Sequence, residues 1–288
     1  MQLDYNAPTR PALRYYGSQW NNAKWIISQW PAHNIRVIPF AGGLNEELQA
    51  PVVKLITAND LDGRVFNFFQ VLRDFRDELI NLLKLTPWHI KEYELSKVQS
   101  ENPLEDARRF FCLCWMSIQG GPVASNSGFR MQKSIESRGL SPAQDLINID
   151  HLYTVAERLK PIQFLQLDAR EIIKMHLQER DALIWCDPPF LAETRARKAG
   201  YNNESTEQLH IDVANLLHKL KGYALVTGYG WNKNGSKNQL YEDLYEARGW
   251  KRVDKEAATN AGGKRIQSIW MSPNTYNSSL PIFNGTKL

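Results

Sequence analysis

The tetrapeptide Asp187-Pro188-Pro189-Phe190 has the composition of a site that holds an amino group. It directly follows the apolar run 182–186, which predicts a buried strand. Proline lacks a backbone N–H and forces the residue before it into an extended conformation. The Asp187 carboxylate and the neighbouring carbonyl groups are therefore left as acceptors beside an aromatic ring that can stack on a ligand. The alternative interpretation is a Pro-Pro turn that only ends the strand.

A second candidate is the turn Pro39-Phe40-Ala41-Gly42-Gly43, at the end of the apolar run 35–40. Glycines in this place let the backbone approach a bound nucleotide closely. The chain has neither a G-x-G-x-x-G motif nor the lysine of a P-loop, so a dinucleotide or phosphate site is not supported. Taken alone, the Gly-Gly pair favours an ordinary turn.

The pair Asn59-Asp60 follows the next strand candidate, 51–57. An acidic residue in that place can accept hydrogen bonds from both hydroxyls of a ribose. The alternative is that Asp60 or Asp62 caps the helix that follows. The ribose interpretation gains weight from the glycine turn, because the spacing of the two segments matches a nucleoside site in a β-α-β unit.

The elements that must position these residues alternate between strand and helix. Short apolar runs predict further strands at 162–167, 223–227 and 266–271, and apolar residues at helical spacing predict helices at 62–84, 170–178, 206–220 and 238–248. This alternation indicates an α/β fold with a doubly wound, mostly parallel sheet. Residues 87–150 interrupt it with helical patterns, of which 105–118 is the clearest, and the polar segment 274–288 predicts a poorly ordered tail.

Composition narrows the class of protein. The 288 residues carry a formal net charge of +4, a mild basic excess that does not by itself indicate nucleic-acid binding. The three cysteines, Cys112, Cys114 and Cys186, are too few for a disulfide scaffold and lack the spacing of a zinc site, which favours a reducing cytoplasm and no metal. Residues 1–10 are polar and no apolar run approaches membrane-spanning length, so we expect neither a signal peptide nor membrane insertion.

Taken together and in order, these segments resemble the D12 class (Dam-like) of adenine-N6 DNA methyltransferases over residues 12–273. The catalytic motif of that class is Asp-Pro-Pro-Tyr, its cofactor turn begins Pro-Phe, and further motifs resemble residues 13–19, 59–62 and 67–74. The chain differs from the family pattern at Ser18, Gln19, Ile38 and Phe190, where the family has Gly, Lys, Glu and Tyr.

The resemblance implies a Rossmann-like catalytic domain, residues 1–86 and 151–273, that binds S-adenosylmethionine. The cofactor would lie over the Pro39–Gly43 turn, with its ribose on Asp60, its adenine amino group on Asp168, and its methionine end under Tyr15 and Gly17. Asp168 is an equally good helix cap. Asp187 and the Pro188 carbonyl would accept the two N6 hydrogens of a flipped adenine, and Phe190 would stack on that base.

The resemblance also makes residues 87–150 a target-recognition insert for double-stranded DNA. Its candidates for phosphate or base contacts are Arg108, Arg109, Arg130, Lys133 and Arg138. A solvated helix face is an equally good interpretation of Arg108 and Arg109. Other functions remain open: methylation of cytosine N4 or of an amide nitrogen, which present similar amino chemistry, or a non-catalytic module that binds DNA or cofactor, for which the departures at Gln19, Ile38 and Phe190 would speak.

Overall fold

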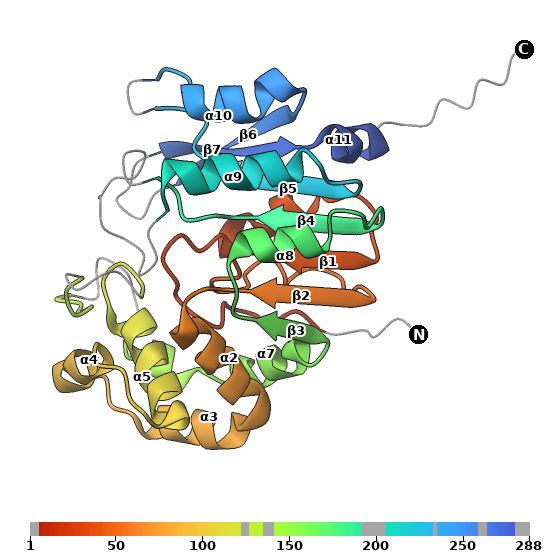
Figure 1. Ribbon diagram of the computed structural model, residues 1–288. Coiled ribbons are helices and arrows are strands. Elements are labelled where there is room, and N and C mark those ends of the chain that lie inside the picture. The colour runs from red at the N-terminus through yellow and green to blue at the C-terminus, as the bar shows by residue number, and fades with distance from the viewer. Residues whose placement is uncertain are drawn as a thin grey trace, which may run out of the picture.

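The computed structural model describes residues 6–121, 127–134, 141–191, 205–232, 235–258 and 264–279. The strands of these residues form one sheet in the order β3-β2-β1-β4-β5-β7-β6 (Figure 1). The strand bounds are β1 Ile35–Ile38, β2 Leu55–Asn59, β3 Ile162–Leu165, β4 Ala182–Cys186, β5 Tyr223–Gly228, β6 Lys251–Ala258 and β7 Lys264–Met271. Strands β1 to β5 pair in parallel, and β7 runs antiparallel between β5 and β6. The predicted doubly wound, mostly parallel sheet is confirmed.

Helices cover both faces of the sheet. Their bounds are η1 Trp20–Asn22, α1 Ala23–Ile27, α2 Gly63–Asp74, α3 Arg76–Leu85, α4 Ile90–Ser96, α5 Pro103–Met116, α6 Gln144–Ile147, α7 His151–Leu159, α8 Ala169–Met175, α9 Glu207–Leu217, α10 Gln239–Leu244, η2 Glu246–Arg248 and α11 Pro273–Ser279. Because successive strand residues point to opposite faces, β4 serves two cores. Leu183 and Trp185 pack into the core that includes α2, α5 and α7, whereas Ile184 and Cys186 pack under α8, α9 and α10.

Two elements differ from the sequence expectation. The helix expected at 62–84 is broken at Phe75, whose backbone leaves the helical region (φ −131°, ψ 44°) between α2 and α3. Each half keeps its own buried apolar face, so the periodicity continues across the break and does not reveal it. Strand β6 was not expected at all. It is the edge strand of the sheet, and its sequence, KRVDKEAA, is mostly polar and lacks the apolar run of a central strand.

The expectation of a poorly ordered segment from residue 274 is wrong for residues 274–279, because Pro273–Ser279 forms helix α11. Thr275 is buried, its hydroxyl donates to the Ala224 carbonyl (3.1 Å), and it accepts from the Ala224 N–H (3.0 Å). These bonds dock α11 on the start of β5, which explains its order despite a polar sequence. Residues 280–288 lie outside the described part of the chain.

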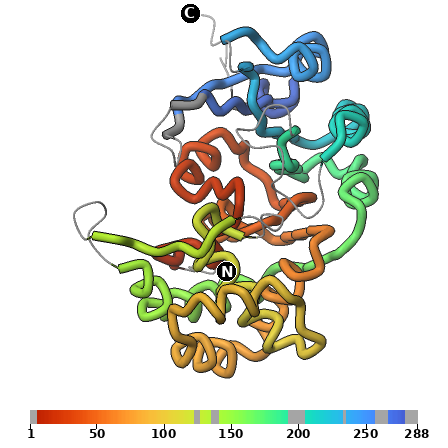
Figure 2. Tube along the Cα trace, turned by 90° about the vertical axis from the view of Figure 1, so that its left-hand side faces the viewer, coloured from red at the N-terminus to blue at the C-terminus, as the bar shows by residue number. Residues whose placement is uncertain are grey.

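The helical insert is continuous with the core of the sheet. Phe110 and Phe111 of α5 belong to the same apolar cluster as Leu183 and Trp185 of β4. In both ribbon and tube views α3, α4 and α5 form a lobe below the sheet, at the opposite end of the molecule from α10 (Figures 1 and 2). The insert therefore packs against the sheet through α2 rather than through a separate core.

One buried amide joins the ends of three neighbouring strands. Asn59, 1% exposed at the end of β2, donates to the carbonyls of Pro39 (3.0 Å) after β1 and Leu167 (2.9 Å) after β3. Its Oδ1 accepts from the Leu167 N–H (2.8 Å). A single side chain therefore fixes the positions at which three chain segments leave the sheet.

We expect the substitution Asn59→Ala to destabilise the fold by about 1–3 kcal/mol, because it leaves the Leu167 N–H and two carbonyls buried without partners. Urea unfolding followed by circular dichroism measures the change. Asn67→Ala is the matched control, since Asn67 makes one solvent-exposed bond to the Pro103 carbonyl; it should cost less than about 1 kcal/mol. Equal losses for the two variants would show that Asn59 has no special structural role.

Candidate active site

A cavity opens where the strand order reverses, between the carboxyl ends of β1 and β4. Ligands of open parallel sheets bind at this kind of switch point. The cavity holds about 990 Å³ of atom-free space, including its open mouth, which is large enough for a nucleoside-sized molecule. Most of the predicted site residues line it: Tyr15, Gly17, Pro39, Phe40, Ala41, Gly42, Gly43, Asp60, Asp168, Asp187 and Pro189.

The glycine turn after β1 is held open by its conformation. Gly42 has φ +47°, which disfavours any larger residue, and a Cβ atom there would touch the Tyr15 ring at 3.4 Å. A Cβ atom on Gly43 would lie 3.1 Å from the Asn45 Nδ2 atom. The next residue, Leu44, is buried with φ +53°, a strained backbone conformation for leucine. The turn thus exposes backbone rather than side chains to the cavity.

Asp60 ties this turn to the end of β2. Its carboxylate accepts from the Gly42 N–H (2.7 Å) and from the Asp62 N–H (2.9 Å). Burial raises the pKa of Asp60 to about 6, although these two backbone hydrogen bonds favour its charged form. The helix cap is a different residue: Asp62 accepts from the Arg64 N–H (3.0 Å) at the start of α2. Asp60 is therefore not a helix cap.

Asp187 lies at the carboxyl end of β4 and shares the cavity wall with a second carboxyl group, Glu46. Burial, and then the negative charge of Glu46, raise the pKa of Asp187 well above its ordinary value. Burial likewise raises the pKa of Glu46 to about 7. Glu46 is 6% exposed and its Oε1 atom is buried without a hydrogen-bond partner in the described part of the structure.

The rest of the Asp-Pro-Pro-Phe segment is fixed from the side of α9. His210 Nε2 lies 3.2 Å from the Pro189 carbonyl oxygen. Burial lowers the pKa of His210 to about 4, so its ring is neutral at pH 7 and donates only when Nε2 carries the proton. Phe190 is 6% exposed and packs edge-on against Tyr229, with 4.6 Å between ring centroids. Pro188 and Phe190 are not among the residues that line the cavity.

Asp168 is the N-terminal cap of helix α8, one of the two roles that the sequence suggested for it. Its carboxylate accepts from the Arg170 N–H (2.8 Å) at the start of α8 and pairs with the Arg170 guanidinium (2.6 Å). This hydrogen bonding to Arg170 lowers the pKa of Asp168. Asp168 still borders the cavity, but its carboxylate already accepts three hydrogen bonds from Arg170.

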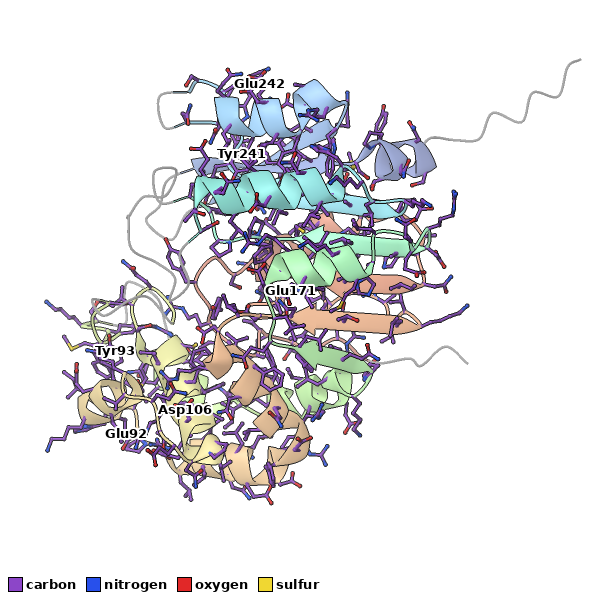
Figure 3. The ribbon with its side chains drawn as sticks, in the orientation of Figure 1. Glu92, Tyr93, Asp106, Glu171, Tyr241 and Glu242 are labelled. Carbon is purple, nitrogen blue, oxygen red and sulfur yellow. The ribbon has the colours of Figure 1, made fainter. Side chains whose placement is uncertain are left out.

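The arginines suggested for DNA contact are largely engaged within the insert. Arg108 is 8% exposed and bonds to Glu92 (2.7 Å) and Glu105 (2.7 Å), and Arg109 also pairs with Glu105 (2.8 Å). Figure 3 shows Glu92 in the same lobe as Asp106, which pairs with Arg64 of α2 (3.0 Å). Arg108 therefore stabilises the packing of α4 on α5 and does not offer a free cation to DNA.

The remaining three candidates differ in their surroundings. Arg130 pairs with Asp145, donates to the Trp115 carbonyl (3.1 Å) and lies over the Trp88 ring (5.5 Å to its centroid). Lys133 is exposed. Arg138 lies outside the described residues.

Sequence reasoning missed several cavity residues, including Ser18, Asn45, Glu46 and Leu209. Glu46 comes three residues after the glycine turn, so its position along the chain was a usable signal. Leu209 reaches the cavity from α9, which no local pattern could reveal. Gln19, where the family has lysine, is buried but is not among the lining residues.

The cavity wall is acidic. Its described lining residues include Glu46, Asp60, Asp62, Asp168 and Asp187, but no lysine, arginine or histidine. Such a wall suits a ligand with positive charge. Among the described residues, no group of three or more His, Cys, Asp or Glu side chains is arranged to hold a metal ion, and no helix is long and apolar enough to cross a membrane.

Comparisons with known proteins show the family of the chain. A search of curated proteins finds no match. A solved structure described as "a putative RNA methyltransferase" from Pyrococcus horikoshii is 8% identical, with a TM-score of 0.40, covering 93% of this chain and 92% of the other. The family model of the D12 class N6 adenine-specific DNA methyltransferases matches residues 15–259. Because this match spans most of the chain, the protein belongs to the D12 class N6 adenine-specific DNA methyltransferase family.

Proposed function

We propose that the chain transfers a methyl group from S-adenosylmethionine to N6 of an adenine that has been flipped out of double-stranded DNA. The observation that carries the proposal is the position of Asp187, which enters the same cavity as the glycine turn and Asp60. Family membership supports the reaction class and the DNA substrate. The acidic wall fits a methyl donor that carries a sulfonium and an ammonium group.

The residues present fit this donor. The Gly42-Gly43 backbone leaves room that a Cβ atom would fill. We assign the ribose to Asp60 and the methionine end to the side of the cavity formed by Tyr15 and Gly17. When bound, S-adenosylmethionine supplies an electrophilic methyl group. Because Arg170 already uses Asp168, we expect Asp168 to contribute less to the adenine ring than Asp60 does to the ribose.

Asp187 and the Pro188 carbonyl would act on the target base. The lone pair of an exocyclic amine is delocalised into its ring, so N6 is a weak nucleophile. Accepting both N6 hydrogens favours a tetrahedral nitrogen and frees its lone pair to attack the methyl carbon in line. Transfer would form the N–C bond as the C–S bond breaks, with the bonding electrons left on sulfur, and the displaced N6 proton would pass to the Asp187 carboxylate that accepts it. Positioning and fixed acceptors supply the catalysis.

Phe190 would stack on the flipped base, which is worth about 1–3 kcal/mol. In the structure its ring is covered by Tyr229, so stacking requires one of the two rings to move when the base enters.

Incubation with labelled methyl donor and unmethylated DNA, followed by nucleoside analysis, tests the function. Detection of N6-methyladenine would support the proposed function. Detection of N4-methylcytosine would show that cytosine, not adenine, is the target base. No incorporation of label would indicate a non-catalytic module.

The substitution Asp187→Asn should lower methyl transfer at least about 100-fold, because a carboxamide accepts the N6 hydrogens more weakly than a carboxylate and cannot take up a proton. Binding of S-adenosylhomocysteine, measured by calorimetry, should change less than about threefold. Glu171→Gln, on the exposed face of α8 (Figure 3), is the control for the loss of one negative charge. A variant that loses cofactor affinity but keeps its turnover per bound cofactor would contradict this role.

Asp60→Asn should weaken S-adenosylhomocysteine roughly ten- to a hundredfold, because a ribose hydroxyl loses a charged acceptor. The effect should depend on pH. Burial raises the pKa of Asp60 to about 6, so the carboxylate is lost as the pH falls through that value. Wild-type affinity should therefore fall between pH 7 and pH 5, by about tenfold per unit at most. A pH dependence that is unchanged in Asp60→Asn would assign the titration to another group.

Lys133→Ala should weaken DNA binding and reduce the slope of log affinity against log salt concentration by about 0.9, the value for one lost phosphate contact. Fluorescence anisotropy at several salt concentrations measures the slope. Lys221→Ala is the charge-matched control, because Lys221 is exposed just before β5, at the edge of the sheet away from the cavity. Equal slopes for wild type and Lys133→Ala would move the DNA contact elsewhere.

A further inference from the structure

We propose that Glu46 binds the α-ammonium group at the methionine end of the methyl donor. This inference rests on the proposed function, which places S-adenosylmethionine in the cavity, and adds to it a specific side chain that the sequence did not single out.

The first support is an unused hydrogen-bond acceptor. Glu46 lines the cavity, is 6% exposed, and its Oε1 atom is buried without a hydrogen-bond partner in the described part of the structure. Burying a carboxylate oxygen without a donor is costly. A ligand that brings N–H donors and a positive charge would satisfy this oxygen.

The second support is the contrast with the next residue, Glu47. Glu47 is equally buried, but Arg36 donates to its Oε2 atom (2.9 Å) and Arg158 lies 4.0 Å from its Oε1 atom. Among the described residues, cations contact Glu47, whereas the hydrogen-bond donors near the Glu46 carboxyl group are neutral N–H groups, of Trp185 and of its own backbone. Glu46 therefore has no cationic partner in the described part of the protein, and its Oε1 atom has no donor.

The third support is the shortage of positive charge in the cavity wall. The negative charges of Glu46 and Asp187 repel each other, and the described lining residues include no lysine, arginine or histidine. Two neighbouring carboxyl groups favour a cationic ligand over a neutral or anionic one. An ammonium group offers three donors in a compact charge, and a charge-assisted hydrogen bond is roughly twice as strong as a neutral one.

The fourth support is the position of Glu46 relative to the rest of the donor site. Asn45, next to it, accepts from the Ser18 hydroxyl (3.1 Å), so Glu46 lies beside the segment that includes Tyr15 and Gly17. That is the side to which we assign the methionine end. Asp60, to which we assign the ribose, reaches the turn from the end of β2 and accepts from the Gly42 N–H (2.7 Å).

The test compares two ligands that differ only at this end. S-adenosylhomocysteine and 5′-methylthioadenosine share the adenosine and the thioether, but only the former has an ammonium and a carboxylate group. Glu46→Gln should weaken S-adenosylhomocysteine roughly ten- to a hundredfold and 5′-methylthioadenosine less than about twofold, by calorimetry. A loss cannot come from the ligand's carboxylate, because removing the charge of Glu46 would strengthen any binding of that group.

Glu46→Asp keeps the charge but withdraws the carboxylate, so it should show the same ligand selectivity with a smaller loss. Thermal unfolding of each variant verifies that the protein is folded, and Glu171→Gln is the control for net charge. Equal losses for the two ligands, or no loss for either, would overturn the assignment of Glu46 while leaving the proposed function intact. Wild-type protein that binds neither ligand would overturn both.

Discussion

The hydrogen bonds of Asn59 are the constraint on which the site depends. Parallel strands place their carboxyl ends at one edge, but nothing in strand pairing fixes the loops beyond that edge. The Asn59 amide bonds to the segments after β1 and β3 from the end of β2. It thereby positions the glycine turn on one side and the Asp168 loop on the other. The Ala41 N–H donates to the Asn59 carbonyl (2.8 Å), so the backbone of the same residue also holds the turn.

A site held this rigidly can keep carboxyl groups partly desolvated. The raised pKa values of Asp60, Glu46 and Asp187 have burial as their first cause. Raised acid pKa values mean that the charged form is destabilised in the empty cavity, and a cationic ligand would recover that free energy on binding. Asp168 shows the opposite behaviour, because Arg170 stabilises its charge. The wall therefore contains three acids whose charged forms are destabilised by burial and one whose charge is stabilised by Arg170.

The parts of the site that the sequence predicted are those whose chemistry is local. Asp187 could be recognised because a Pro-Pro pair follows an apolar strand, and Asp60 because it follows the next strand after the glycine turn. Glu46 follows the glycine turn closely, but its lack of a cationic partner depends on where Arg36 and Arg158 point in the folded chain, which the sequence does not show. The same limit applies to strand β6, whose polar edge sequence acquires its structure only by pairing with β7.

Arg108 shows how a local pattern gains meaning from a neighbouring residue. Glu105 precedes Arg108 and Arg109 by three and four residues, a spacing at which helical side chains meet, and the structure pairs it with both. The contact between insert and cavity lies elsewhere. After α5 the chain pairs with the N-terminal segment: Gly121 forms a bridge with Tyr15, and the Arg14 guanidinium donates to the Ser117 carbonyl (2.6 Å). Because Tyr15 lines the cavity, any displacement of this part of the insert must also move a wall of the cavity.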